Sequence, residues 1–115
     1  MITVYGIKTC DTVRKALKWL QAQGTPHTYH DFRIDGLEAA KVKYWVDELG
    51  WESVLNKRST TWKKLTDDQK GSLNELGAAA LMVAHPTLVK RPVFEFQGLV
   101  LQGFTDAVRQ RISSL

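Results

Sequence analysis

The spacing of apolar and polar positions predicts a strand, a helix and a second strand at the start of the chain. Residues 2–5 (ITVY) form a short β-prone run that ends at Gly6. Gly24 suits the position just beyond a helix end, and residues 27–32 (HTYHDF) predict a second strand. Between the strands, apolar residues recur with the i, i+3, i+4, i+7 spacing of an amphipathic helix, and they are Val13, Ala16, Leu17 and Leu20. Because this helix supplies a crossover, we expect the two strands to pair in parallel.

The middle of the chain predicts helices only. One helix is expected over residues 37–49, and short helical turns near residues 51–55 and 60–62. Residues 66–69 fit a capping box, with Thr first and Gln three residues later, and open a further helix. A last stripe with helical spacing ends before residue 85 and consists of Leu73, Leu76, Ala80 and Val83.

The last part of the chain predicts a β-hairpin and a closing helix. Residues 93–96 (VFEF) and 99–101 (LVL) are the two strands, joined by a tight turn at Gln97–Gly98. The apolar face of the closing helix consists of Phe104, Val108, Ile112 and Leu115. The predicted order is therefore β-α-β-α, a helical insert and β-β-α. This is a thioredoxin-like α/β layout with a mixed four-stranded sheet.

The composition is that of a folded domain. The chain has 115 residues, of which 43% are hydrophobic, and it holds four Trp and four Phe. We expect one domain over residues 1–115, with a helical insertion at about residues 37–85 between its two halves. No apolar run approaches the roughly 20 residues that span a membrane, and the first residues lack the layout of a secretory signal. A single cysteine offers no disulfide framework, so we expect a soluble protein of the cytoplasm with no membrane partner.

The charge is mildly basic and gives little indication of nucleic-acid binding. Sixteen Lys and Arg face twelve Asp and Glu, for a formal charge of +4, and only Lys63–Lys64 forms a dense pair. Anionic small molecules and an acidic patch on a protein partner are equally compatible with this charge.

Cys10, the only cysteine, lies where the first strand gives way to the first helix. Backbone N–H groups have no intrahelical partner there, and the helix dipole places partial positive charge beside the sulfur. Lys8 and Arg14 add positive charges nearby in sequence. Such surroundings favour the thiolate, the reactive form of cysteine. They indicate a nucleophilic or redox cysteine, although a lone cysteine is also often a small buried hydrophobe.

No second cysteine is available to resolve a disulfide within the chain. The position three residues after Cys10, where a dithiol motif would have its second cysteine, is Val13. If Cys10 does redox chemistry, its reductant must therefore come from outside, and glutathione or a glutathione-linked protein is the expected one.

Pro92 opens the predicted third strand, and a thioredoxin-like fold would bring Cys10 close to it. A proline at the first position of a strand is compatible with an ordinary trans peptide bond. The fold analogy instead implies a cis bond, which usually marks a fixed turn.

These segments resemble a known family. YGIKTCDTVRKAL resembles the Cys-x-x-x-Arg start of the glutaredoxin-coupled arsenate reductases, the ArsC superfamily. LNKRS and AHPTLVKRPV resemble the basic loop and the Arg-cis-Pro segment of the same family. The resemblance covers residues 1–115 and is strongest to the YffB branch. It implies that the chain, like the members of that branch, is a glutathione-dependent thiol reductase. The Spx branch of transcriptional regulators is a more distant relative.

The resemblance implies roles for particular residues. Cys10 would be the nucleophile, and Arg58 and Arg91 would stabilise its thiolate and grip an anion. A guanidinium suits this task because it is permanently charged and presents a fork of donors. Residues expected to bind substrate or glutathione are Lys8, Thr9, Asp11, Thr12, Arg14, Lys57 and Pro92, of which the two lysines are more typical of solvated charges.

The chain also departs from the family pattern. Gly6 stands where the arsenate reductases have a histidine, and the third arginine of their oxyanion site is replaced near Gly103. Both changes weaken an arsenate reductase interpretation, because fewer positive groups would face a doubly charged oxyanion. Val13 breaks the CxxC switch of the Spx regulators.

The sequence thus predicts an oxidoreductase, a glutathione-dependent thiol reductase in which Cys10 forms a mixed disulfide with glutathione. The alternatives are a glutaredoxin-coupled arsenate reductase and a non-enzymatic, Spx-like regulator that binds RNA polymerase. We expect no tightly bound cofactor, with glutathione as co-substrate, glutaredoxin as a further partner, and a small anionic or disulfide substrate. No metal site is predicted, because the three histidines lack metal-ligand spacing with the one cysteine: His27, His30 and His85.

Overall fold

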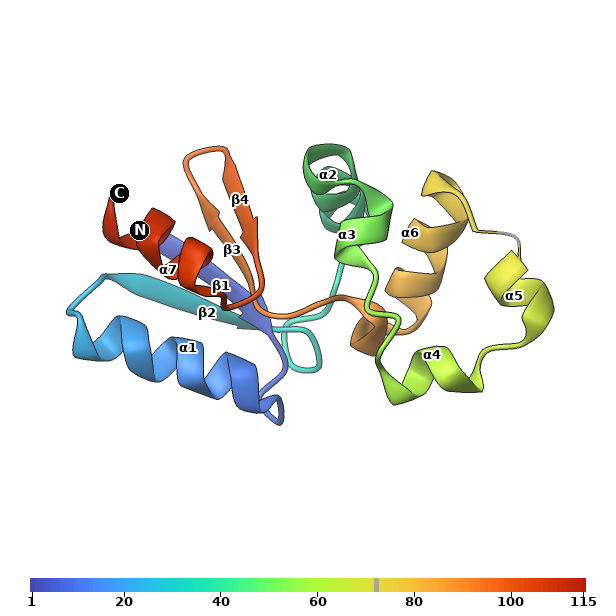
Figure 1. Ribbon diagram of the computed structural model, residues 1–115, viewed down its shortest axis with the longest axis horizontal. Helices are drawn as coiled ribbons and strands as arrows, with labels where there is room; N and C mark the ends of the chain where they lie inside the picture. The colour runs from blue at the N-terminus through green and yellow to red at the C-terminus, as the bar shows by residue number, and fades with distance from the viewer. Residues whose placement is uncertain (72) are drawn as a thin grey trace. The chain divides into compact units, whose positions relative to one another are not determined.

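A mixed sheet with the strand order β2-β1-β3-β4 organises the two ends of the chain (Figure 1). Its strands are β1 (Ile2–Gly6), β2 (His27–Asp31), β3 (Val93–Phe96) and β4 (Leu99–Gln102). β1 pairs in parallel with β2 and antiparallel with β3, and β3 pairs antiparallel with β4. The predicted thioredoxin-like sheet, with its parallel crossover and its hairpin, is confirmed.

The computed structural model describes residues 1–71 and 73–115, and these form two compact units. The first unit combines residues 1–36 with residues 91–115 and contains the sheet. The second unit is the continuous segment 37–90. No helix among the described residues is long and apolar enough to cross a membrane.

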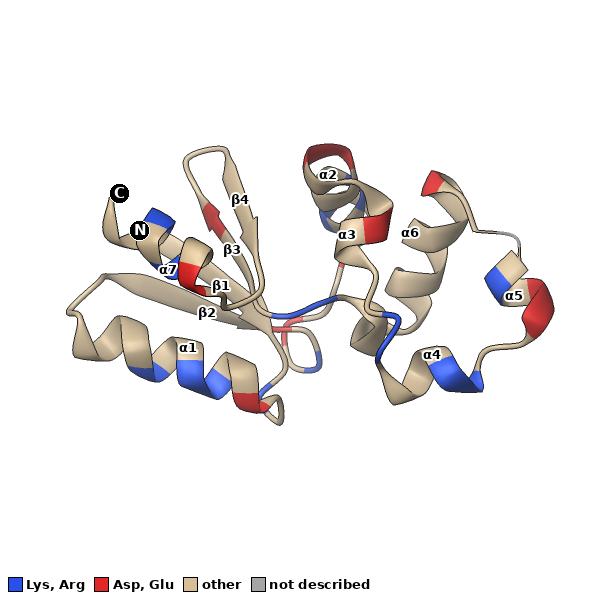
Figure 2. Cartoon of the chain, viewed as in Figure 1, with Lys and Arg blue, Asp and Glu red and all other residues tan. Residues whose placement is uncertain are grey.

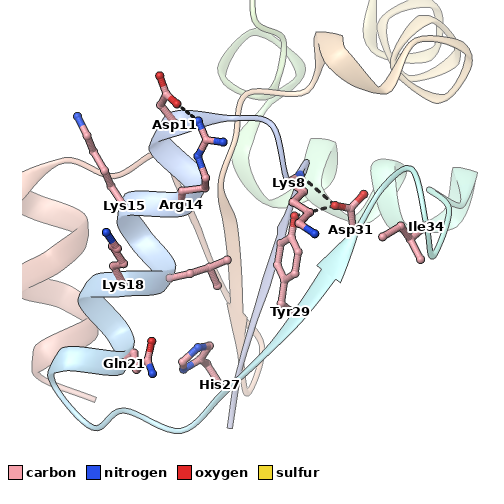
Figure 3. A pocket seen from close by; sticks show the side chains of 11 residues that line it. Lys8, Asp11, Arg14, Lys15, Lys18, Gln21, His27, Tyr29, Asp31 and Ile34 are labelled. Atoms are coloured by element: carbon pink, nitrogen blue, oxygen red, sulfur yellow. Dashed lines mark hydrogen bonds and ion pairs between the residues drawn. The ribbon is translucent and has the colours of Figure 1, made fainter.

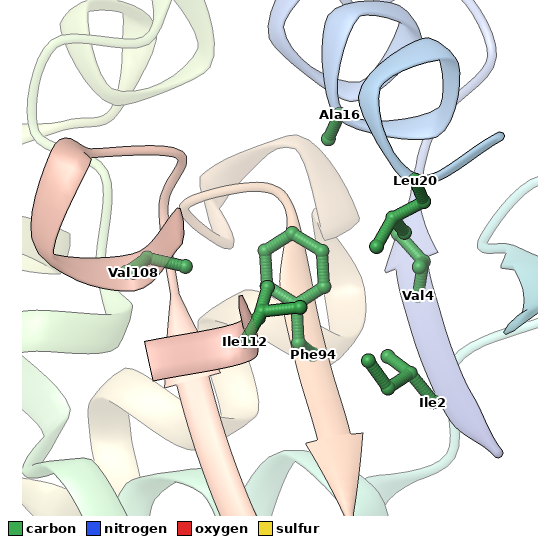
Figure 4. Packing of buried hydrophobic residues seen from close by; sticks show 7 residues of the cluster. All are labelled: Ile2, Val4, Ala16, Leu20, Phe94, Val108 and Ile112. Atoms are coloured by element: carbon green, nitrogen blue, oxygen red, sulfur yellow. The ribbon is translucent and has the colours of Figure 1, made fainter. Parts of the chain in front are cut away.

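Two helices of the first unit share one hydrophobic core with the sheet (Figure 4). They are α1 (Asp11–Ala22) and α7 (Asp106–Ser113). Since apolar residues of both helices meet the same residues of β1 and β3, the two helices cover the same face of the sheet. The buried residues of this core are Ile2, Val4, Ala16, Leu20, Phe94, Val108 and Ile112.

The second unit is helical. Its elements are α2 (Ala39–Leu49), α3 (Trp51–Val54), α4 (Thr60–Lys64), α5 (Asp67–Gly71), α6 (Glu75–Ala84) and a short 3₁₀ helix (Pro86–Leu88). The predicted capping box before α5 is confirmed, since Thr66 N donates to Gln69 Oε1 and Gln69 N donates to Thr66 Oγ1. α2 packs against α6, and the side chains of Trp45 and Met82 are completely buried there.

The apolar face predicted for α6 was wrong. Leu76 is 77% exposed, and Leu73 precedes the helix, which Asn74 caps by accepting a hydrogen bond from Gly77 N. The buried residues are instead Ala78 and Met82. Nearly every residue of α6 is apolar, so spacing does not single out one face, and packing against α2 decides which side is buried.

β1 and α1 approach each other very closely at Gly6. A Cβ atom at this position would lie 2.6 Å from Cγ2 of Val13, whose side chain is completely buried. Real Cβ atoms do not tolerate such a contact, so only glycine fits without movement of the helix or its valine. This contact holds the beginning of α1 against the end of β1.

A buried carboxylate ties the loop before α1 to the end of β2. The side chain of Asp31 is 3% exposed and accepts hydrogen bonds from Lys8 N (2.9 Å), Tyr29 Oη (3.0 Å) and Arg33 N (2.8 Å). Burial by itself would raise the pKa of Asp31, but these hydrogen bonds to the ionised form hold the pKa below its ordinary value. The ionised carboxylate therefore fixes the turn that leads to Cys10.

We expect Gly6→Ala to lower the free energy of unfolding by about 1–3 kcal/mol, because the new Cβ overlaps Val13. A helical valine has one favoured rotamer and cannot turn away. Urea denaturation measures this loss. Gly71→Ala is the control, since nothing lies within 4 Å of a Cβ there. In a Val13→Ala background, where the two γ-carbons are gone, Gly6→Ala should cost much less. An equal loss in both backgrounds would contradict the close-contact explanation.

We expect Asp31→Asn to lower the free energy of unfolding at pH 7 by about 1.5–3 kcal/mol, the usual range for hydrogen bonds to a charged group. The pKa of Asp31 is lower in the folded than in the unfolded chain. Its contribution is therefore present above about pH 4 and is lost as pH falls through the folded-state pKa. The gap between wild type and variant should shrink from pH 7 to pH 3, with the exposed Asp47→Asn as control. A gap that stays constant would refute the role assigned to the ionised carboxylate.

Candidate active site

Cys10 is the N-cap residue of α1, one position before the first helical residue. Its backbone N donates to Ile7 O (3.0 Å), and its carbonyl accepts from Arg14 N (3.1 Å). The Cys10 side chain makes no capping hydrogen bond and is partly exposed. The predicted position of Cys10 at the start of the helix is therefore confirmed, beside the first-turn amides, which have no partner within the helix. Its role as a nucleophile stays a prediction.

Arg91 lies two residues before β3 and close enough to Cys10 to interact with it electrostatically. Burial lowers the pKa of Arg91, attraction to Cys10 opposes this change, and repulsion from Arg33 adds to it. Among the described residues, the buried Nε of Arg91 has no hydrogen-bond partner. The Arg91–Pro92 peptide bond is cis, as the resemblance implied. A guanidinium with a free buried donor beside a reactive sulfur is suited to hold an anionic group there.

The sequence did not point to Arg33, Tyr29 or Asp31 as site residues. Arg33 is an exposed cation close enough to Arg91 to repel it. Burial, the hydrogen bond to Asp31 and the charge of Cys10 all raise the pKa of Tyr29, which keeps its hydroxyl protonated next to the site. A signal existed, because these residues end the strand parallel to β1, and the carboxyl ends of parallel strands meet at one edge.

The predicted residues around the helix start have different surroundings. Arg14 pairs with Asp11 on the exposed surface of α1, so its charge is largely neutralised locally. Thr9 and Thr12 are exposed, and Lys8 contributes its backbone amide to Asp31. The structure therefore brings together Cys10, Arg91, Pro92 and Lys8, while Arg14 is engaged with Asp11.

Arg58 and Lys57 belong to the second unit. Arg58 is exposed, and its backbone N donates to Asn56 Oδ1 (3.1 Å). Lys57 Nζ lies 6.0 Å from the ring centre of Trp51 and 5.7 Å from that of Trp62, a cation–π arrangement that accounts for this lysine structurally. The roles of Arg58 and Lys57 toward Cys10 stay predictions that rest on the resemblance.

Two departures from the family pattern have a structural basis. Position 6 is filled by the side chain of Val13, as described above. Gly103 has φ of +80°, a conformation that favours glycine, and its N donates to Pro92 O (2.8 Å). Position 103 thus lies beside the site but offers no side chain to an anion. Among the described residues, no three His, Cys, Asp or Glu side chains gather as metal ligands would.

Relatives of this chain include both uncharacterized proteins and regulators. An uncharacterized protein from Haemophilus influenzae is 46% identical over 106 residues, which cover 92% of this chain and 93% of that protein. The global transcriptional regulator Spx from Lactiplantibacillus plantarum is 32% identical over 110 residues, which cover 92% of this chain and 81% of the regulator.

Solved structures with the same fold cover nearly the whole chain. A structure described as the YffB protein has a TM-score of 0.92 and 38% identity, covering 97% of this chain and 98% of that one. An arsenate reductase-related protein from Brucella melitensis has a TM-score of 0.79 and 38% identity, covering 99% of this chain and 95% of that one. The ArsC family profile matches residues 5–112. With its thioredoxin-like fold and its cysteine at the start of α1, the chain belongs to the ArsC family.

Proposed function

We propose that the chain is a glutathione-dependent thiol reductase with Cys10 as its nucleophile. The observation that carries this proposal is the buried Nε of Arg91, which has no hydrogen-bond partner among the described residues and lies close to the only cysteine of the sequence. Such a donor can bind a carboxylate or oxyanion of a molecule that docks at the sulfur. A lone cysteine needs an external thiol to complete a reduction, and glutathione supplies both a thiol and carboxylates.

The reaction proceeds by two thiol–disulfide exchanges. The Cys10 thiolate attacks the glutathione sulfur of a mixed disulfide between glutathione and a substrate. A disulfide between Cys10 and glutathione forms, and the electron pair of the broken bond leaves with the substrate thiolate, which takes a proton from water. The thiolate of a second glutathione then attacks the glutathione sulfur bound to Cys10. This step releases glutathione disulfide and restores the Cys10 thiolate, so one free glutathione is oxidised for each mixed disulfide that is reduced, and the other half of the glutathione disulfide comes from the substrate.

The residues around Cys10 would have distinct tasks in these exchanges. Arg91 would hold a glutathione carboxylate and favour the thiolate form of Cys10. Free amides at the start of α1 would stabilise the negative charge of the thiolate that forms there. Arg58 is proposed as a second arginine on the strength of the family resemblance. Glutaredoxin is proposed as an alternative to glutathione in the resolving step.

The two other functions remain rivals for specific reasons. Arsenate reduction is favoured by the ArsC family membership and by the arsenate reductase-related structure at 38% identity. It would require oxyanion contacts from other groups, because a side chain at position 6 would overlap Val13 and the positive φ at position 103 disfavours any residue but glycine. A regulator that binds RNA polymerase is favoured by the Spx relative, although Val13 leaves no CxxC disulfide.

Consumption of NADPH in a mixture of glutathione and glutathione reductase tests the proposal, with glutaredoxin added only when arsenate is the substrate, because glutathione and glutaredoxin together reduce a glutathione mixed disulfide without the chain. Turnover of a glutathione mixed disulfide should be abolished by Cys10→Ser, with an unchanged circular-dichroism spectrum showing that the fold is intact. Turnover of arsenate that depends on Cys10 would favour the arsenate reductase instead. No turnover of either substrate, together with stoichiometric recovery of RNA polymerase in a pull-down, would favour the regulator.

Arg91→Gln should lower kcat/KM for a glutathione mixed disulfide by about 10- to 100-fold, because one charge-assisted contact is lost. Arg14→Gln is the matched control, since Arg14 is paired with Asp11, and should change kcat/KM by less than about twofold. Arg58→Gln should behave like Arg91→Gln. If only Arg91→Gln lowers kcat/KM, Arg58 does not bind the anion. If neither variant lowers kcat/KM, the anion-binding role of both arginines is wrong.

A further inference from the structure

A groove of about 810 Å³ runs along α1 and β2 in the first unit and extends beyond the residues assigned to the reaction (Figure 3). β2 is an edge strand of the sheet, so no described strand covers the outer side of the groove. Its lining residues come from α1, β2 and the loops next to Cys10, and they are Lys8, Asp11, Arg14, Lys15, Leu17, Lys18, Gln21, His27, Tyr29, Asp31 and Ile34.

The unpaired charge of the groove is positive. Its two carboxylates are already engaged, Asp11 by Arg14 and Asp31 by its own hydrogen bonds. Three lysines have no ion pair among the described residues, and they are Lys8, Lys15 and Lys18. The basic residues of α1 follow one another along the helix (Figure 2). An acidic ligand is therefore the one with complementary charge.

The apolar lining of the groove favours an organic ligand over a small inorganic anion. Leu17 and Tyr29 are only partly buried, and Ile34 is 77% exposed at the rim. Apolar contacts combined with a few charged groups are typical of sites for peptides and organic ligands. An occupant that covers Ile34 and pairs with the lysines would use both kinds of surface.

One end of the groove lies next to the turn that contains Cys10. Lys8 and Asp11, on either side of the Cys10 turn, line its end, and Tyr29 in its wall interacts electrostatically with Cys10. From there α1 lines it as far as Gln21. Ten residues of helix rise about 15 Å, which is the length of about four or five residues of extended peptide. Glutathione has one residue on either side of its cysteine, so a glutathione joined to Cys10 cannot extend along the whole groove.

We propose that the groove binds an acidic, extended segment of a protein whose cysteine carries glutathione. This inference rests on the proposed thiol reductase function and names its substrate class. As Cys10 attacks the glutathione sulfur, the substrate sulfur is the leaving group, and the chain attached to it lies along α1 and β2. Lys15 and Lys18 would pair with carboxylates about two to four residues from the modified cysteine, because these lysines lie about 7–12 Å along α1 from Cys10.

The test uses labelled nine-residue peptides that carry one glutathionylated cysteine followed by Asp and Glu, by Gln, or by Lys. Fluorescence anisotropy measures their binding to Cys10→Ser, which cannot react. The acidic peptide should bind about tenfold more tightly than the Gln peptide. Lys15→Glu/Lys18→Glu in the same background should abolish this preference. The control Lys43→Glu/Lys63→Glu makes the same charge change at exposed positions of the second unit and should alter binding by less than about twofold.

Turnover separates this inference from the proposed function. Lys15→Glu/Lys18→Glu should retain activity on a mixed disulfide of glutathione and a small thiol, while losing its preference for the acidic peptide. Equal binding of all three peptides would overturn the inference. So would an equal loss in both double variants, or equally tight binding of a single-stranded DNA of matched charge, which would indicate a general polyanion surface. If wild type turns over no mixed disulfide at all, the proposed function fails, but the binding experiment still decides whether the groove selects acidic peptides.

Discussion

The partly buried guanidinium of Arg91 is the constraint on which the arrangement around Cys10 depends. A cation withdrawn from water needs a compensating charge or hydrogen-bond acceptors, and its Nε has no hydrogen-bond partner among the described residues. Burial lowers the pKa of Arg91, attraction to Cys10 opposes this change, and the nearby Arg33 adds to it. The buried donor of Arg91 is therefore available to an anionic group. This property is the basis for our proposal that anionic molecules bind and react at Cys10.

Contacts of neighbouring residues hold the backbone of Cys10 in place and leave its side chain without a capping hydrogen bond. Gly6 allows α1 to approach β1 until Val13 fills the space above it. Asp31 fixes the turn before Cys10 through the backbone of Lys8. The sulfur is therefore positioned by its neighbours in the chain rather than by hydrogen bonds of its own. A histidine at position 6 would have to displace Val13, so the loss of the arsenate reductase pattern there is linked to the packing of α1.

Local patterns predicted most of the fold, and the remainder depended on packing between distant segments. The spacing of apolar residues and the turn at Gly98 were sufficient for the sheet and its hairpin. The same approach failed for α6, because almost every residue of that helix is apolar and its buried side is chosen by α2. Arg91 was found through a motif, whereas Arg33 lies in an ordinary polar loop. Its nearness to Arg91 arises only when β2 pairs with β1 and β1 pairs with β3.

We propose that Arg91 stabilises the Cys10 thiolate, and the rate of alkylation of Cys10 by iodoacetamide at pH 7 tests this proposal most directly. Only the thiolate reacts, so the rate reports how much of it is present. The account predicts that Arg91→Gln slows alkylation by about tenfold or more, while Arg14→Gln, which removes an exposed and already paired charge, stays within about twofold of wild type. Equal rates in the wild type and in Arg91→Gln would contradict the claim.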